Sequence, residues 1–281
     1  MLRPLKDNRQ LQLCRERYIP SKPALLSQVQ ALAGVREPDV LSISELVSQD
    51  VGLSSAVLKS VNSAFFGLRN HISDIRQTVV LLGVNNVVNL VSAHEMKRAL
   101  NQKSCLTLER FWDTASEVAK ASVLIARELN VPVPLEDVYA VGLFHDCGIP
   151  VMASCFETYR KTLDESNGNY HRSIVEIEDG YHDVNHAVAG FMFGETWDLP
   201  RFIQEIILQH HDADVWEHLN DEHILNCLAV LKLAENLVDH KRRQVDNVDW
   251  QRFAAPVTQR LKLTAASYPA VEKRLIEQMQ D

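Results

Sequence analysis

Apolar residues recur every three to four positions along most of the chain, and the breaks between these stretches fall at Gly, Pro or Asn. This spacing places apolar side chains on one face of a helix, whereas strands would show alternation. Leu25, Val29 and Leu32 form one such face, and Gly34 ends it. The pattern predicts an all-α protein.

The first half is predicted to be a compact bundle of short helices. Ser42 opens the segment Ser-Ile-Ser-Glu, in which Glu45 completes a capping-box pattern at a helix start. The expected helices cover residues 23–33, a stretch from 42, 53–67, 75–82 and 84–100.

The apolar pattern lapses near residues 101–107, where we place a subdomain boundary. Asp137 is expected to cap a helix that ends at Gly148, which puts His145 and Asp146 in its last turn. Other helices of the second half are expected over 108–129, 185–196, 200–211, 223–240 and 264–279. The predicted organisation is an extension (1–19), a domain (20–243) with an N-terminal bundle (20–105) packed on a second subdomain (106–243), and a tail (244–281).

Composition excludes several classes of protein. The 281 residues are 46% hydrophobic, enough for a sizeable core, and the net charge of -8 disfavours direct binding of nucleic acid. Five scattered cysteines without a CxxC pair indicate a reducing compartment. The N-terminus lacks an apolar signal region, and polar residues interrupt the most apolar stretch, 79–91. We therefore expect a cytoplasmic protein without a membrane anchor.

Histidines concentrate in the second half, where eight of the 11 fall between His145 and His223. Three of them precede an aspartate directly. Imidazole and carboxylate together are the ligands that divalent iron, manganese or zinc take in proteins, and a bound metal acidifies water for attack on phosphate esters. The alternative for His145 is a structural histidine whose charge the C-terminal end of its helix favours.

Spacing limits which histidines can act together. His182 and His186 are four residues apart and would share one helix face. His210 and His211 diverge by about 100° around a helix, so we expect one of the two at the surface.

Six short motifs follow one another along the chain: NSAFFG (62–67), ISDIRQTVVLLG (72–83), FW (111–112), GLFHDCG (142–148), HAVAG (186–190) and IILQHHD (206–212). In this order, over about residues 20–240, they resemble the HDOD family, a relative of the HD phosphohydrolases. The resemblance implies a multi-helix HDOD architecture with an HD-like subdomain. It also implies metal ligands comprising an early His, the His-Asp pair and a late Asp, with further histidines for a second metal.

The sequence departs from that ligand set. Thr114 stands where the early His is expected, and Glu235 stands where the late Asp is expected. The remaining candidate ligands are His145, Asp146, His186, His210 and Glu235. They would hold Fe, Mn, Zn or Mg at partial occupancy at most, and Asp146 would be catalytic if the protein is an enzyme.

Three functions follow from this pattern. The first is a non-catalytic regulatory protein that acts through a protein partner in a signalling pathway, because the family motifs are kept while the ligand set is broken. The second is a metal-dependent phosphohydrolase. The third is a sensor that binds a nucleotide or another anion without turnover.

Overall fold

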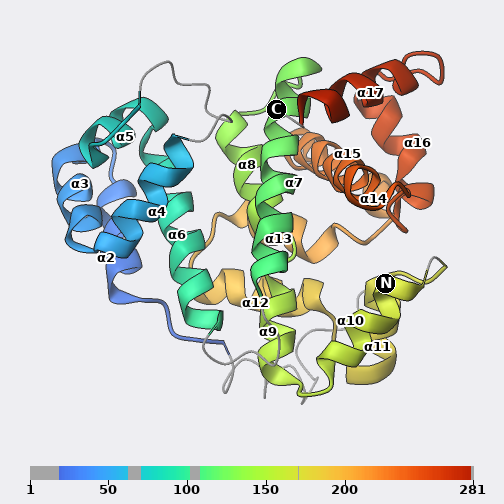
Figure 1. The fold of residues 1–281 in the computed structure, drawn as a ribbon, viewed down its shortest axis with the longest axis horizontal. Helices are drawn as coiled ribbons and strands as arrows, with labels where there is room; N and C mark the ends of the chain where they lie inside the picture. The colour runs from blue at the N-terminus through green and yellow to red at the C-terminus, as the bar shows by residue number, and fades with distance from the viewer. Residues whose placement is uncertain (1–18, 63–70, 102–107, 170, 280–281) are drawn as a thin grey trace. The chain divides into compact units, whose positions relative to one another are not determined.

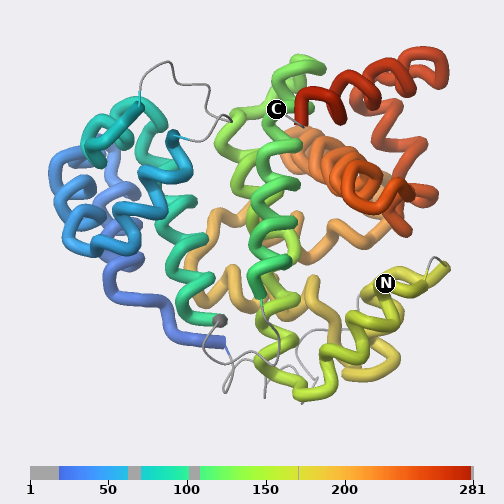
Figure 2. The backbone as a smooth tube through the Cα atoms, in the orientation of Figure 1, coloured from blue at the N-terminus to red at the C-terminus, as the bar shows by residue number. Residues whose placement is uncertain are grey.

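The computed structural model describes residues 19–62, 71–101, 108–169 and 171–279, and the described chain contains helices and no strands. The predicted all-α class is confirmed. The chain forms two compact units (Figure 1). One is Ser21–Gln102, and the other is Lys103–Asp281 together with the segment up to Pro20. Figure 2 traces the first unit in blue to teal and the second in green to red.

Three helices of the first unit begin at aspartates. Asp39, Asp50 and Asp74 each accept a backbone N–H at the start of a helix, as N-cap side chains do. The expected start at Ser42 is wrong, because Asp39 caps that helix three residues earlier. The helices of this unit are α2 (Ala24–Ala33), α3 (Val40–Gln49), α4 (Val51–Val61), α5 (Ile75–Leu82) and α6 (Val84–Asn101). Residues 63–67 of the NSAFFG motif lie outside the described residues.

The second unit is built around its longest helices, with α7 packed between α8 and α15 and with α12 packed against α9 and α13. The middle of α15 is buried almost continuously from Cys227 to Val238. The helices of this unit are α7 (Glu109–Glu128), α8 (Leu135–Phe144), α9 (Gly148–Cys155), α10 (Tyr159–Gly168), α11 (Ile174–His182), α12 (His186–Thr196), α13 (Arg201–Gln209), α14 (Val215–His218), α15 (Glu222–Arg243), α16 (Trp250–Arg260) and α17 (Tyr268–Gln278).

Gly148 begins α9 and does not end α8, which corrects the predicted end of that helix. A Cβ atom built on Gly148 would lie 1.8 Å from the backbone oxygen of His186 and 2.6 Å from the backbone nitrogen of Gly190. The helices α9 and α12 therefore cross with their backbones in contact, which only glycine allows. This crossing places the start of α12 against the turn that joins α8 to α9.

Leu135–Cys155, which contains α8 and α9, is long and apolar enough to cross a membrane by composition, but 78% of its apolar window is buried inside the protein. The pair α5 and α6 passes the same test only if taken together, and it is bent by 119°. Buried core helices have this composition.

Candidate metal centre

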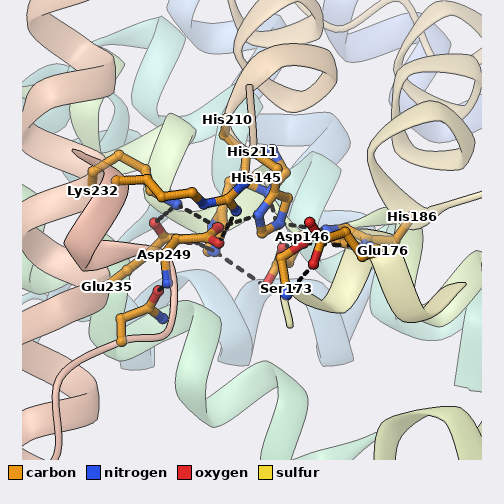
Figure 3. Close-up of polar contacts among 12 residues, drawn as sticks. His145, Asp146, Ser173, Glu176, His186, His210, His211, Lys232, Glu235 and Asp249 are labelled. Atoms are coloured by element: carbon orange, nitrogen blue, oxygen red, sulfur yellow. Dashed lines mark hydrogen bonds and ion pairs between the residues drawn. The ribbon is translucent and has the colours of Figure 1, made fainter. Parts of the chain in front are cut away.

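The tight turn between α8 and α9 carries His145 and Asp146 at the floor of the second unit. His145 is the C-cap residue of α8, and Asp146 follows it before α9 begins. The structure brings together the five residues proposed from sequence, His145, Asp146, His186, His210 and Glu235, and adds His211, Lys232 and Asp249 to them (Figure 3).

Both histidines of the pair after α13 face this cluster, so the expectation that one of them lies at the surface is wrong. The helix ends at Gln209, and His210 and His211 occupy the turn that follows it. The angular spacing of a helix therefore does not apply to them. Their ring centroids lie 4.1 Å apart, His210 is fully buried, and the His211 side chain is 12% exposed.

His182 lies outside the cluster, which corrects the prediction that it shares a helix face with His186. The helix α11 ends at His182, and Asp183 takes a left-handed backbone conformation (φ 55°) that separates α11 from α12. His182 instead contacts the Thr162 hydroxyl at 2.8 Å and packs on the Phe156 ring.

In each of the four clustered imidazoles, the Nδ1 atom forms a hydrogen bond to an acceptor. His145 and His210 donate to the backbone oxygens of Gly142 (2.9 Å) and Ile207 (2.8 Å). Because a carbonyl oxygen can only accept, Nδ1 carries the proton in both rings.

The other two histidines donate from Nδ1 to buried carboxylates. His186 Nδ1 lies 2.7 Å from Glu178 Oε2, and the same oxygen accepts the His186 backbone N–H at 3.0 Å. Tyr159 holds the second Glu178 oxygen, and His211 Nδ1 contacts Asp249. A carboxylate on the far nitrogen fixes the tautomer and raises the basicity of the nitrogen that remains.

The four Nε2 atoms therefore point at groups that also accept. His186 Nε2 and His210 Nε2 each lie 3.2 Å from Asp146 Oδ1, and His186 Nε2 lies 3.0 Å from His211 Nε2. We call these three histidines with Asp146 Oδ1 the histidine half of the cluster. Lone pairs that face one another at such distances require a shared proton or a cation between them.

The second oxygen of Asp146 serves a different group. Asp146 Oδ2 lies 3.3 Å from His145 Nε2, which is also 3.5 Å from Glu235 Oε1. We call His145, Asp146 Oδ2 and Glu235 the carboxylate half. Asp146 thus faces both halves, one oxygen to each, as a carboxylate that bridges two positive centres would.

The electrostatics of the cluster favour positive charge. Burial alone would lower the pKa of His186, but Glu178 and Asp146 outweigh burial and raise that pKa to about 10. Burial likewise opposes the raised pKa of His145, and Asp146 outweighs it. The Asp146 pKa is well below its usual value because His145 outweighs the effect of burial. Without a bound metal, protons on His145 and His186 therefore balance the negative charge of the neighbouring carboxylates.

The remaining two imidazoles stay neutral. Burial lowers the pKa of His210, and burial followed by the neighbouring His210 lowers that of His211 well below its usual range. Neutral imidazole is the form that ligates metals.

Two basic side chains of α15, Lys232 and Arg242, contact the carboxylate half and the neighbouring Thr114. Lys232 Nζ lies 2.6 Å from Glu235 Oε2 and 3.5 Å from Asp249 Oδ2. Thr114, in place of the expected His, donates to the backbone oxygen of Arg110 (2.8 Å) and accepts from Arg242 Nη1 (2.5 Å). Its hydroxyl is thus already paired.

A cleft of about 1020 Å³ opens over the cluster in the second unit. His145, Asp146 and His211 line its floor, and 28% of the Asp146 side chain is exposed. Its walls include Arg110 and Arg160, whose guanidinium groups form no ion pair with another described residue. The cleft can admit a ligand with negative charge.

The histidine half fits a divalent metal. One donor atom each from Asp146, His186, His210 and His211 lies within 4.8 Å of all the others. Ligands on a tetrahedral zinc ion with bonds of about 2.0–2.1 Å are separated by about 3.3 Å. This separation is close to the 3.2 Å from Asp146 Oδ1 to His186 Nε2 and to His210 Nε2, and to the 3.0 Å between His186 Nε2 and His211 Nε2. Three imidazoles and one carboxylate are also a suitable donor set for zinc, iron or manganese.

Sequence reasoning missed three residues that support the cluster. Lys232 gave a signal, because a lysine interrupts the apolar run of residues 227–234. Glu178 and Asp249 gave none, since only tertiary packing brings them to His186 and His211.

An all-helical fold with a His-Asp pair at a helix end and further histidines around it defines the class of HD-type proteins. Residues 19–213 match the model of the HDOD domain, and the chain belongs to the HDOD family. An uncharacterized protein of Treponema pallidum (strain Nichols) is 29% identical over 196 residues, which are 69% of this chain and 38% of that protein. The chain thus spans well under half the length of this relative.

Two solved structures share the fold. A Shewanella amazonensis SB2B protein, provisionally named a phosphohydrolase, matches with a TM-score of 0.72 and 18% identity over 98% of this chain and 95% of its own. A Marinobacter aquaeolei VT8 protein, provisionally named a signal transduction protein, matches with a TM-score of 0.72 and 17% identity over 96% of this chain and 63% of its own. At these identities the likeness shows the fold alone.

Proposed function

We propose that this chain is a regulatory module of a signalling pathway that binds one divalent metal ion in its histidine half. The observation that carries the proposal is the convergence of His186 Nε2 and His210 Nε2 on Asp146 Oδ1, with His211 Nε2 only 3.0 Å from His186 Nε2, while every Nδ1 has another partner. Such preorganised, buried donors are expensive to assemble unless a cation uses them.

The donor set selects among metals. Three imidazoles favour zinc, iron or manganese over magnesium, which prefers oxygen ligands. When bound, such an ion supplies a concentrated positive charge that polarises a phosphoryl oxygen or a water molecule. The residues of this chain hold and orient that charge: His186 through Glu178 and His211 through Asp249.

Regulation is favoured over hydrolysis because the carboxylate half is not available to a metal. Thr114 provides a paired hydroxyl in place of an imidazole, and Lys232 occupies one oxygen of Glu235. A module that binds an ion without turnover can act only through another molecule that it contacts. We therefore propose that this module acts on a protein partner.

Metal analysis tests this proposal. The chain is purified without a histidine tag or chelators, and its zinc, iron and manganese are measured by mass spectrometry. We expect about one equivalent per chain and its loss in His186→Ala. The matched control is His171→Ala, which removes an exposed histidine and should keep the metal. Metal near zero, or equal metal in both variants, would refute the proposal.

A second candidate is a metal-dependent phosphohydrolase, favoured by the cleft that opens on Asp146 between Arg110 and Arg160. It predicts manganese-stimulated release of nitrophenol from mono- and bis-nitrophenyl phosphate, abolished in Asp146→Asn. Robust turnover of this kind would replace the regulatory proposal. Thermal stabilisation by nucleotides without turnover would instead indicate an anion sensor, since ligand binding to the folded state raises stability with ligand concentration.

A further inference from the structure

Lys232 is an unusual residue for its position. It lies in the apolar middle of α15 between Leu231 and Leu233, both buried, and only 2% of its side chain is exposed. Its ammonium lies 4.7 Å from the centre of the Phe253 ring. An ammonium group loses its hydration at such a site, so burial is tolerated only if counter-charges surround it.

Two carboxylates supply those counter-charges. Lys232 Nζ is 2.6 Å from Glu235 Oε2 and 3.5 Å from Asp249 Oδ2. These two buried carboxylates stabilise the charged form of the ammonium at a position where it has little contact with water. Lys232 therefore brings a permanent positive charge into the carboxylate half.

That charge lies beside the place where a second metal ion would need to bind. Glu235 turns its other oxygen to His145 Nε2 at 3.5 Å, and His145 faces Asp146 Oδ2 at 3.3 Å. Among the described residues these three make up the carboxylate half, and Thr114, which stands where a further ligand is expected, has its hydroxyl held by Arg242. A dication beside them would sit next to the ammonium and be repelled by it.

We propose that Lys232 is a built-in cation that takes the place of a second metal ion in the carboxylate half and so limits the cluster to one metal. This inference rests on the proposed function, in which the first ion occupies the histidine half. Through Asp249, which contacts both Lys232 and His211, the lysine also supports a ligand of that first ion. Lys232, Glu235 and Asp249 all lie beyond the segment that matches the family model, residues 19–213.

The test is metal stoichiometry in Lys232→Met, which keeps the length of the apolar stem and removes the charge. Chelator-stripped proteins are equilibrated with excess Mn²⁺ or Zn²⁺, desalted and analysed by mass spectrometry. We expect one equivalent in the wild type and two in Lys232→Met. Lys232→Arg should stay at one because it keeps the charge. Lys120→Met, which alters an exposed lysine of α7, is the matched control and should also stay at one.

The outcomes separate the two proposals. One equivalent in both the wild type and Lys232→Met overturns the role of Lys232 and leaves the proposed function intact. No metal in the wild type but one equivalent in Lys232→Met supports the role of Lys232 and refutes the proposed function. No metal in either protein refutes both.

Thermal unfolding shows whether a change in metal content of Lys232→Met comes from poor folding of the variant. Removal of the ammonium leaves Glu235 and Asp249 without their buried partner, so Lys232→Met in chelator should melt below the wild type. Added Mn²⁺ should restore its melting temperature, and a further Glu235→Gln substitution should abolish the restoration. If the variant is destabilised and the metal restores nothing, Lys232 forms only a structural ion pair and the inference is wrong.

Discussion

Glu178 illustrates how a single carboxylate governs this cluster. It is fully buried and accepts from His186 through both the ring and the backbone, while Tyr159 holds its other oxygen. The Glu178 carboxylate therefore sets the tautomer and the orientation of the ring, and it makes His186 Nε2 a stronger ligand.

Glu178→Gln should weaken metal binding by about 10–100-fold, because the amide oxygen can still accept from His186 but carries no charge. The measurement is a competitive titration against a metal indicator dye. Glu176→Gln is the control, since Glu176 lies on the same helix and its carboxylate accepts from the Ser173 backbone N–H at the helix start, not from a histidine of the cluster. Equal weakening in the two variants would show that the effect comes from the stability of α11.

The sequence was a good guide to which residues gather and a poor guide to how they do so. His145, Asp146, His186, His210 and Glu235 lie in one cluster, as the family motifs led us to expect. His211 was misjudged because we assumed that the helix continues through it. Metal binding itself stays a prediction.

At the scale of helices, periodicity located most elements but not their junctions. The helices predicted over 108–129, 185–196 and 223–240 are confirmed within a few residues. The helix α16 was missed because Pro256 lies inside it, and proline ordinarily argues against a helix interior. The sequence around Gly148 predicts a helix end, whereas Gly148 begins α9, because a residue without a side chain is needed where α9 packs against α12.

Gly148→Ala should be strongly destabilising, because the new methyl group would lie 1.8 Å from the His186 backbone oxygen and force α9 and α12 apart. Overpacking in a core costs about 1–3 kcal/mol and sometimes more. Urea unfolding followed by circular dichroism measures the loss. Gly168→Ala, at the end of α10 with open space around it, should be neutral or stabilise by up to about 1 kcal/mol. Similar curves for both variants would contradict the close crossing.

At the scale of the whole molecule, all residues of the candidate metal centre belong to one of the two units. The ligands and their supports come from the turn after α8, from α11 and α12, from the turn after α13, from α15 and from the residue before α16. The unit Ser21–Gln102 contributes none of the clustered residues, although it contains two of the family motifs.

Metal should therefore stabilise the molecule unevenly. Hydrogen exchange measured with chelator and with added Zn²⁺ should show slower exchange near 142–148, 186–190 and 206–212, where backbone amides lie next to ligands. The helices α2–α4 should exchange at the same rate in both conditions. His186→Ala should show no metal response anywhere. A uniform change across the chain would argue against a localised site.

The spread of the cluster along the chain has a consequence for synthesis. His145 and Asp146 leave the ribosome long before Lys232 and Glu235, and Asp249, which fixes His211, emerges later still. Contacts this distant in sequence form late, after the helices between them have closed the intervening loops. A nascent or truncated chain without Asp249 lacks the carboxylate that orients His211, so tight cation capture would mark a chain whose synthesis has passed α15 and whose second unit has folded.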